Sequence, residues 1–161
     1  MPRSLVTIDI RVDYAPWRRA WPGLSKDVKS LLIDVSRNRS LLSSKPHGEV
    51  ALVFADDACL KDLNSQFRGK AKPTNVLSFP DSESPLGGIA IAFETIEREA
   101  CEQNKSFVNH SKHMILHGFL HLLGYDHVKP HAARLMEGLE IAILSSMGIS
   151  NPYRIEDKTR A

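Results

Sequence analysis

The stretch from Met114 to His127 reads M-I-L-H-G-F-L-H-L-L-G-Y-D-H, and the rest of the chain is interpreted around it. Its large apolar residues leave no polar face in the first half, which predicts a buried helix. Gly124 is suited to the left-handed conformation that ends a helix, so we expect the helix to stop there. The stretch therefore predicts a central helix against which the other elements pack.

Three histidines in this stretch have the spacing of metal ligands. His117 and His121 are four positions apart, about one turn of α-helix, so their imidazoles project from one face. His127 follows the glycine and can return to the same side. A catalytic zinc takes three protein ligands and keeps a further position for water. Hydrogen-bonded core histidines or a surface triplet would be the alternative, but they do not explain the spacing as well.

His113 lies one turn before His117 and extends the pair into a stripe. About 1.5 Å of rise per residue places His113 about 12 Å from His121 along the axis. Bonds of about 2 Å to one ion cannot gather both ends of that stripe, so His127 is the better third ligand. Asp126, beside it, can orient a histidine through its second nitrogen or can cap the turn, and both interpretations remain open.

The same spacing occurs in the metzincin signature H-E-x-x-H-x-x-G-x-x-H, with one difference. Gly118 stands where those peptidases carry a glutamate, which is the general base that acts on the zinc-bound water. The ligand positions are kept and the base is missing. This combination argues against peptide hydrolysis.

The composition is that of a soluble protein, with 161 residues, 42% of them apolar and 25% charged. We expect a single domain over residues 1–161. The net charge of +2 neither requires nor excludes a nucleic acid, so any basic surface is local. Cys59 and Cys101 match no C-x-x-C motif and are expected to be buried thiols in a reducing cytoplasm rather than a disulfide. No apolar run approaches the ~20 residues that span a bilayer, so no membrane association is expected.

The periodicity predicts an α+β fold, with a small, mostly four-stranded mixed sheet and about five helices packed around the buried central helix. Ser106 is expected to cap that helix, and His110, near its start, to be exposed. The other helices are expected to start near Ser25, as an N-cap, and near Asp56 or Asp57, Thr95 and Pro130, and the last of them is expected to bury Leu135 on its apolar side. The expected strands cover residues 6–12, 50–55, 74–80 and 86–93, residues 14–23 and 81–85 are expected to be loops, and residues 154–161 a frayed tail.

A short cationic segment contains Arg68, Lys70 and Lys72. A solvated surface is the simpler interpretation of such a charge run. Arg68, however, lies where a helix ends just before a strand bordered by prolines, a junction that can aim a side chain. Its guanidinium matches phosphate oxygens in a bidentate way, which an ammonium group cannot do.

The run H-G-F-L-H-L-L-G-Y-D-H, residues 117–127, resembles the signature of the YbeY family, which are bacterial metal-dependent endoribonucleases. The similarity covers about residues 50–153. Its further blocks are F-R-G-K (67–70), K-P-T-N-V-L-S-F-P (72–80), L-G-G-I-A-I (86–91), M-E-G-L-E (136–140) and N-P-Y (151–153). One departure is Gly88, which replaces the aspartate of the usual L-G-D-I. If that carboxylate supports the site, the activity of this chain is expected to be weaker than that of other members or differently tuned.

The resemblance implies one zinc ion per chain, held by His117, His121 and His127, although imidazole also suits other divalent transition metals. It implies that His117 and Arg68 are catalytic. It also implies cleavage of single-stranded RNA, with roles in maturing the 3′ end of small-subunit ribosomal RNA and in ribosome quality control. Its expected partners are then the small ribosomal subunit and associated factors, with Arg68, Lys70 and Lys72 as candidate RNA contacts.

Two other functions remain open at this point. A metallohydrolase acting on another substrate, such as a peptide, is favoured by the ligand spacing and opposed by Gly118. A zinc-stabilised, non-catalytic ribosome-associated factor would have a closed four-ligand site. The nucleophile, water or the 2′-hydroxyl of the RNA, and the oligomeric state are not fixed by the sequence.

Overall fold

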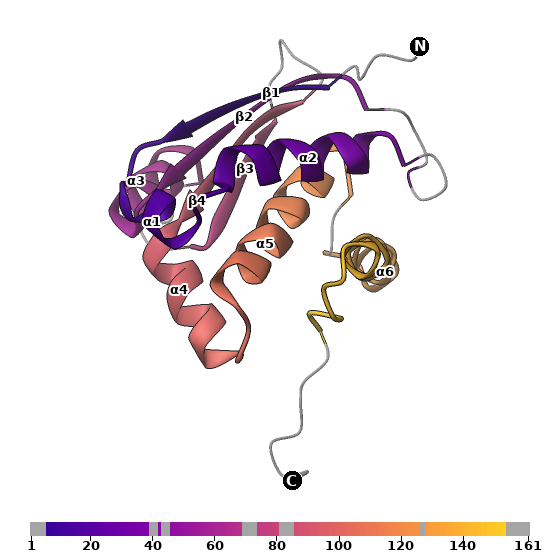
Figure 1. Cartoon of the computed structure of the whole chain (residues 1–161). Coiled ribbons are helices and arrows are strands. Elements are labelled where there is room, and N and C mark those ends of the chain that lie inside the picture. The colour runs from indigo at the N-terminus through magenta and orange to yellow at the C-terminus, as the bar shows by residue number, and fades with distance from the viewer. Residues whose placement is uncertain are drawn as a thin grey trace, which may run out of the picture.

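The computed structural model describes residues 6–38, 42, 46–68, 74–80, 86–125 and 128–153, with the side chains of Phe67 and Arg68 excepted. These residues form four strands and six helices (Figure 1). In chain order they are β1 (Val6–Val12), α1 (Pro16–Ala20), α2 (Leu24–Ser36), β2 (Gly48–Ala55), α3 (Asp57–Arg68), β3 (Val76–Pro80), β4 (Gly87–Ala92), α4 (Phe93–Glu102), α5 (Phe107–Leu122) and α6 (Pro130–Ser146).

The strands form one mixed sheet in the order β1-β2-β4-β3. Strands β1, β2 and β4 are parallel, and β3 is the antiparallel edge strand beside β4. Alternation along β2 explains why both faces are covered: Val50, Leu52 and Phe54 point to one face, and Ala51 and Val53 to the other. The predicted α+β class with a small mixed sheet is confirmed.

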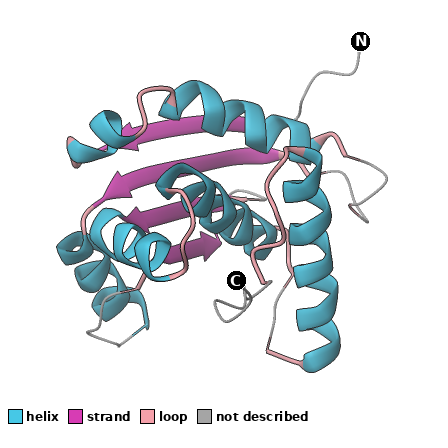
Figure 2. Ribbon diagram, turned by 60° about the horizontal axis from the view of Figure 1, so that its bottom comes forward, coloured by secondary structure: helices cyan, strands magenta, loops and turns pink. Residues whose placement is uncertain are grey.

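Helices cover the two faces of the sheet unequally. The larger core packs apolar residues of α2 and α5, such as Leu32 and Phe119, against Leu52 and Ile89 of the sheet. On the opposite face a smaller core packs Leu60 of α3 against the sheet. Helix α6 lies beside α5 rather than over the sheet (Figures 1 and 2). No helix in the described part of the chain is long and apolar enough to cross a membrane.

The central helix α5 matches its sequence prediction closely. Ser106 caps its start, with the hydroxyl accepting a hydrogen bond from the backbone N–H of Asn109 at 3.0 Å. Gly124 follows its end in the left-handed region, with φ +100°. Between them Ile115, Leu116, Phe119 and Leu120 are fully buried.

A close approach between α5 and the sheet occurs at Gly118. The hydroxyl of Ser78 on β3 donates to the carbonyl oxygen of Gly118 at 2.9 Å. A Cβ atom at Gly118 would lie 3.1 Å from that hydroxyl and 3.2 and 3.3 Å from methyl groups of Ile89 and Val76. This glycine therefore lets the helix rest directly on β3 and β4, and sets which of its faces turns away from the sheet.

The prediction of a loop over residues 14–23 is wrong, because the segment contains α1. Pro16 stands in the first turn of that helix, where its fixed φ favours helical backbone. Trp17 is fully buried, and its indole N–H donates to the carbonyl oxygen of Ala55 at 2.8 Å. Edge-to-face contacts of Trp17 with Phe54 and Phe93 complete this anchor. Tertiary contacts therefore fold a segment whose composition is typical of a loop.

Three smaller expectations are also wrong. Helix α2 begins at Leu24 without a side-chain cap, so Ser25 does not cap it. Leu135, expected on the inner side of the last helix, is 53% exposed. His110, expected to be exposed, is buried, because α4 lies against this end of α5 and supplies Glu99 as its hydrogen-bond partner. The expected loop 81–85 and the tail 154–161 lie outside the described residues.

The substitution Gly118→Ala is expected to destabilise the protein. Alanine improves helix propensity by up to about 1 kcal/mol, but overpacking a close contact costs about 1–3 kcal/mol. Two of the three atoms that the new methyl group would meet belong to β-branched side chains fixed on the sheet.

Gly138→Ala on α6 is the matched control, since a Cβ there meets nothing within 4 Å. Chemical denaturation should show a lower free energy of unfolding for Gly118→Ala and an equal or higher one for Gly138→Ala. A stabilised Gly118→Ala protein would contradict the close approach described above.

Candidate metal centre

His117 and His121 lie side by side on α5. Their Nε2 atoms are 3.2 Å apart, and their ring planes are inclined at 81°. Two nitrogen ligands at about 2.0–2.1 Å from a tetrahedral zinc are about 3.3 Å apart, so the pair has the separation that one ion requires. Both side chains are half-buried, whereas most of the residues around them on α5 are buried. The pair therefore faces the accessible side of the helix.

Glu140 of α6 fixes the orientation of one member of this pair. Its carboxylate is completely buried, and Oε1 lies 2.8 Å from Nδ1 of His117. A carboxylate only accepts, so His117 donates from Nδ1 and keeps its proton there. Its Nε2 then carries the lone pair and lies on the side of His121, which is the usual arrangement for a metal-binding histidine.

Glu140 is ionised despite its burial. Burial raises the pKa of this carboxyl, but hydrogen bonds from His113, His117 and Tyr153 outweigh that effect and lower the pKa to about 2. Nε2 of His113 donates to Oε2 at 2.6 Å, and the hydroxyl of Tyr153 donates to the same oxygen. Three hydrogen-bond donors therefore converge on one buried anion.

Among the described residues, no lysine or arginine side chain pairs with this anion. Within the described residues its ion-pair contacts are with His113 and His117 alone. Burial lowers the pKa of His113, in spite of the opposing effect of Glu140, which favours the neutral imidazole. A buried carboxylate without a countercharge is costly. A cation bound at the Nε2 atoms of His117 and His121 would supply that countercharge, so the donor set fits a metal ion.

A second hydrogen-bonded group lies at the other end of α5. Nε2 of His110 is 2.9 Å from Oε1 of Glu99 on α4, and Asn75 donates to the same carboxylate at 3.0 Å. The Oδ1 atom of Asn75 accepts from the backbone N–H of Val76, where β3 begins. This group joins α4, α5 and β3, and we interpret it as structural.

The structure describes the remaining predicted site residues only in part or not at all. His127 and Asp126 lie outside the described residues, as do Lys70 and Lys72. Arg68 is the last residue of α3, and its side chain is outside the description. Within the described part of the chain, no group of three His, Cys, Asp or Glu side chains is arranged to hold a metal ion. The third ligand thus stays a prediction.

The sequence predicted no role for Glu140 or Tyr153, although both lie in blocks that resemble the family, residues 136–140 and 151–153. Glu140 carried a detectable signal, because it stands on the apolar stripe of α6 between Met136 and Ile143, where a charged residue must find partners. Tyr153 carried only its place in the N-P-Y block, which does not predict what its hydroxyl contacts. It follows the end of α6, and only the folded chain brings its hydroxyl to the carboxylate.

The structure also explains the glycine that replaces the peptidase base. A side chain at position 118 would be directed at Ser78, Ile89 and Val76. It would press against β3 and β4, in a space that has no room for a glutamate. A general base at that position is therefore incompatible with this packing.

Comparisons with known proteins agree with the sequence resemblance. The family model described as Endoribonuclease YbeY matches residues 21–148. A protein named Endoribonuclease YbeY from Rhizobium johnstonii is 54% identical over 117 residues, which is 68% of each chain. One of the same name from Methylocella silvestris is 43% identical over 152 residues, covering 91% of this chain and 85% of that protein.

A solved structure shares the fold. The solution structure of TM1509 from Thermotoga maritima superposes with a TM-score of 0.57 over 92% of this chain and 99% of that one. The sequence identity is 24%, so the likeness concerns the fold alone. It supports the arrangement of sheet and helices described above.

The Glu99 group predicts a dependence of stability on pH. Burial raises the pKa of Glu99, but hydrogen bonds from His110 and Asn75 outweigh it, and the pKa lies below the ordinary 4.5. A carboxyl group whose pKa is lowered on folding stabilises the folded state at pH values above its ordinary pKa. This stabilisation is lost as the pH falls through the lower, folded-state pKa.

Denaturation of the wild type and of Glu99→Gln over a pH series measures this contribution. The wild type should be the more stable at neutral pH, and the difference should shrink once the pH falls below 4.5. A difference that persists unchanged into strong acid would show that Glu99 does not contribute through its charge.

Proposed function

The chain belongs to the endoribonuclease YbeY family, and from this premise we propose that it is a metal-dependent endoribonuclease that cleaves single-stranded RNA. The observation that carries the proposal is the pair of Nε2 atoms 3.2 Å apart on His117 and His121, with the first held by buried Glu140. A pair of imidazole nitrogens on the accessible side of a buried helix suits a catalytic ion better than a purely structural one.

We propose one zinc ion per chain, bound by His117, His121 and His127, with other divalent transition metals as possible substitutes. Glu140 supports this assignment because it keeps the Nδ1 atom of His117 protonated and supplies a negative charge that a cation would balance. When bound, such an ion supplies Lewis-acid stabilisation of a phosphate oxygen and a coordinated water of lowered pKa.

Different residues would then contribute to different parts of phosphodiester cleavage. The histidines orient the centre, and Arg68, at the end of α3, is proposed to stabilise the charge that develops on the phosphate oxygens. Lys70 and Lys72 would add contacts to the RNA backbone, which makes binding weaken with added salt. No carboxylate at position 118 takes part, because the packing of α5 on the sheet leaves no space for one.

The biological role proposed for this activity is the maturation of the 3′ end of small-subunit ribosomal RNA, with a part in ribosome quality control. The partners would be single-stranded ribosomal RNA, the small subunit and its associated factors, in the cytoplasm. Cys59 and Cys101 are free thiols, which is compatible with a reducing compartment, but they are not buried as expected, since Cys59 is half-buried and Cys101 is exposed. The modest net charge of +2 favours recognition through a local surface rather than through the whole molecule.

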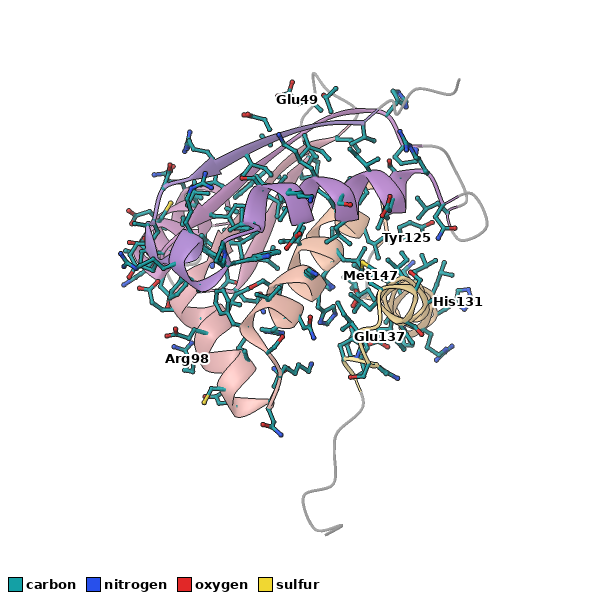
Figure 3. All side chains as sticks on the ribbon, viewed as in Figure 1. Glu49, Arg98, Tyr125, His131, Glu137 and Met147 are labelled. Carbon is teal, nitrogen blue, oxygen red and sulfur yellow. The ribbon has the colours of Figure 1, made fainter. Side chains whose placement is uncertain are left out.

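Two substitutions separate metal binding from chemistry. His121→Ala should lose both zinc retention and RNA cleavage, because one corner of the coordination sphere is gone. Arg68→Ala should retain zinc and lose cleavage by about a hundredfold or more, the scale expected when one group that stabilises transition-state charge is removed. His131→Ala is the control, since His131 is exposed on α6 and points away from α5 (Figure 3).

The measurements are metal analysis of the purified proteins and cleavage of an end-labelled single-stranded RNA. A His121→Ala protein that cuts RNA at the wild-type rate would overturn the proposal. A wild type that retains zinc and binds RNA without cutting it would instead point to a non-catalytic ribosome-associated factor. Zinc-dependent peptide turnover would support a metallohydrolase with a different substrate.

A further inference from the structure

Glu140 receives hydrogen bonds from residues that are distant in the sequence. His113 and His117 belong to α5, whereas Tyr153 lies in the turn that follows α6. The donors are divided between the two carboxylate oxygens. His113 and Tyr153 both donate to Oε2, and His117 alone donates to Oε1. Two donors thus hold one oxygen in place and leave the other directed at His117.

The turn that carries Tyr153 is held in place by its own contacts. Nζ of Lys105, in the loop between α4 and α5, donates to the carbonyl oxygen of Pro152 at 2.8 Å. The side chain of Asn151 accepts from the backbone N–H of Tyr153 at 2.9 Å. The Tyr153 ring meets the ring of His113 edge to face, with centroids 5.5 Å apart. The position of the hydroxyl is therefore defined by three separate contacts.

Burial of the Tyr153 ring does not account for this placement. The residue is 41% exposed, yet its hydroxyl reaches a carboxylate that is completely buried. The raised pKa of Tyr153, caused by burial of the hydroxyl and by Glu140, keeps it protonated as a donor. The contribution of this residue therefore lies mainly in the donated hydrogen bond rather than in the apolar area that it removes from water.

We propose that Glu140 is the positioning residue of the metal centre and that Tyr153 acts through it, so that the turn at residues 151–153 is part of the site. This inference rests on the metal-binding function proposed above. Neither residue is a ligand in this arrangement. Glu140 fixes the orientation and the tautomer of the His117 ring, and Tyr153 and His113 fix the position of the Glu140 carboxylate.

The physical reason lies in the two tautomers of a neutral imidazole. Only the form protonated at Nδ1 offers an Nε2 lone pair to an ion. An acceptor at Nδ1 selects that form and fixes the ring rotation, and loss of such an acceptor typically lowers metal affinity by about 10–100-fold. If Glu140 only fastened α6 to α5, its replacement would lower stability and leave the affinity of the folded protein unchanged.

The test measures zinc affinity of the folded full-length protein by competition with a chromophoric chelator. Glu140→Gln should weaken zinc binding by about 10–100-fold. Tyr153→Phe keeps the ring and removes only the hydroxyl, so it should weaken binding in the same direction by a smaller factor. Tyr14→Phe is the matched control, because Tyr14 packs on Phe93 of α4 and is not among the described hydrogen-bond partners of Glu140.

A double-mutant cycle separates action through Glu140 from an independent effect. Tyr153→Phe should change zinc affinity in the wild type and have little further effect in the Glu140→Gln protein. Additive effects would overturn the part assigned to Tyr153. An affinity of Glu140→Gln within twofold of the wild type would overturn the part assigned to Glu140.

A spectroscopic measurement on the wild type needs no substitution in the network. In protein treated with a chelator and kept at mildly alkaline pH, ¹⁵N-labelled histidine should show His117 protonated at Nδ1. Predominant protonation at Nε2 would overturn the proposal even if Glu140→Gln failed to fold. Zinc-loaded wild type that does not cleave RNA would count against the proposed function and leave this inference standing.

Discussion

The fold depends most on one buried anion. Glu140 has no exposed surface, and its ionised carboxylate is acceptable only because three donors converge on it. Two of these donors belong to α5 and one to the turn after α6. The same carboxylate therefore docks α6 on α5, orders the C-terminal turn and orients His117. The removal of any one donor leaves part of a buried charge unsatisfied, so packing and site geometry cannot vary independently.

A second constraint acts on the opposite side of α5. Gly118 allows the helix to pack closely on β3 and β4, and the hydroxyl of Ser78 donates a hydrogen bond across this contact to the carbonyl oxygen of Gly118. With that side fixed against the sheet, His117 and His121 must point elsewhere, toward α6 and the accessible surface. The spacing resembles that of metalloproteases, but the residue that supplies their general base is here the contact point between helix and sheet. A side chain at this position would therefore be directed at the sheet.

The sequence predicts the elements that local patterns determine and misses those that distant contacts determine. Alternating residues predicted β1, a short apolar run predicted β2, and Ser106 and Gly124 predicted both ends of α5, because these features lie within a few residues of each other. Helix α1 was missed because its anchor is Trp17 bonded to Ala55, 38 positions away. The partnership of His117 with Glu140, 23 positions away, was missed for the same reason. His127 and the side chain of Arg68 lie outside the described residues, so their placement stays a prediction.

The row of histidines on α5 shows why spacing alone cannot assign a ligand. His113 and His117 are as far apart as His117 and His121, and periodicity treats all three alike. The hydrogen-bond partners of their ring nitrogens distinguish them. Nε2 of His113 is buried and bonded to Glu140, so it has no lone pair for an ion, whereas His117 binds the same carboxylate through Nδ1 and turns Nε2 toward His121. One carboxylate therefore converts a uniform stripe into one supporting histidine and one candidate ligand, according to which ring nitrogen it occupies.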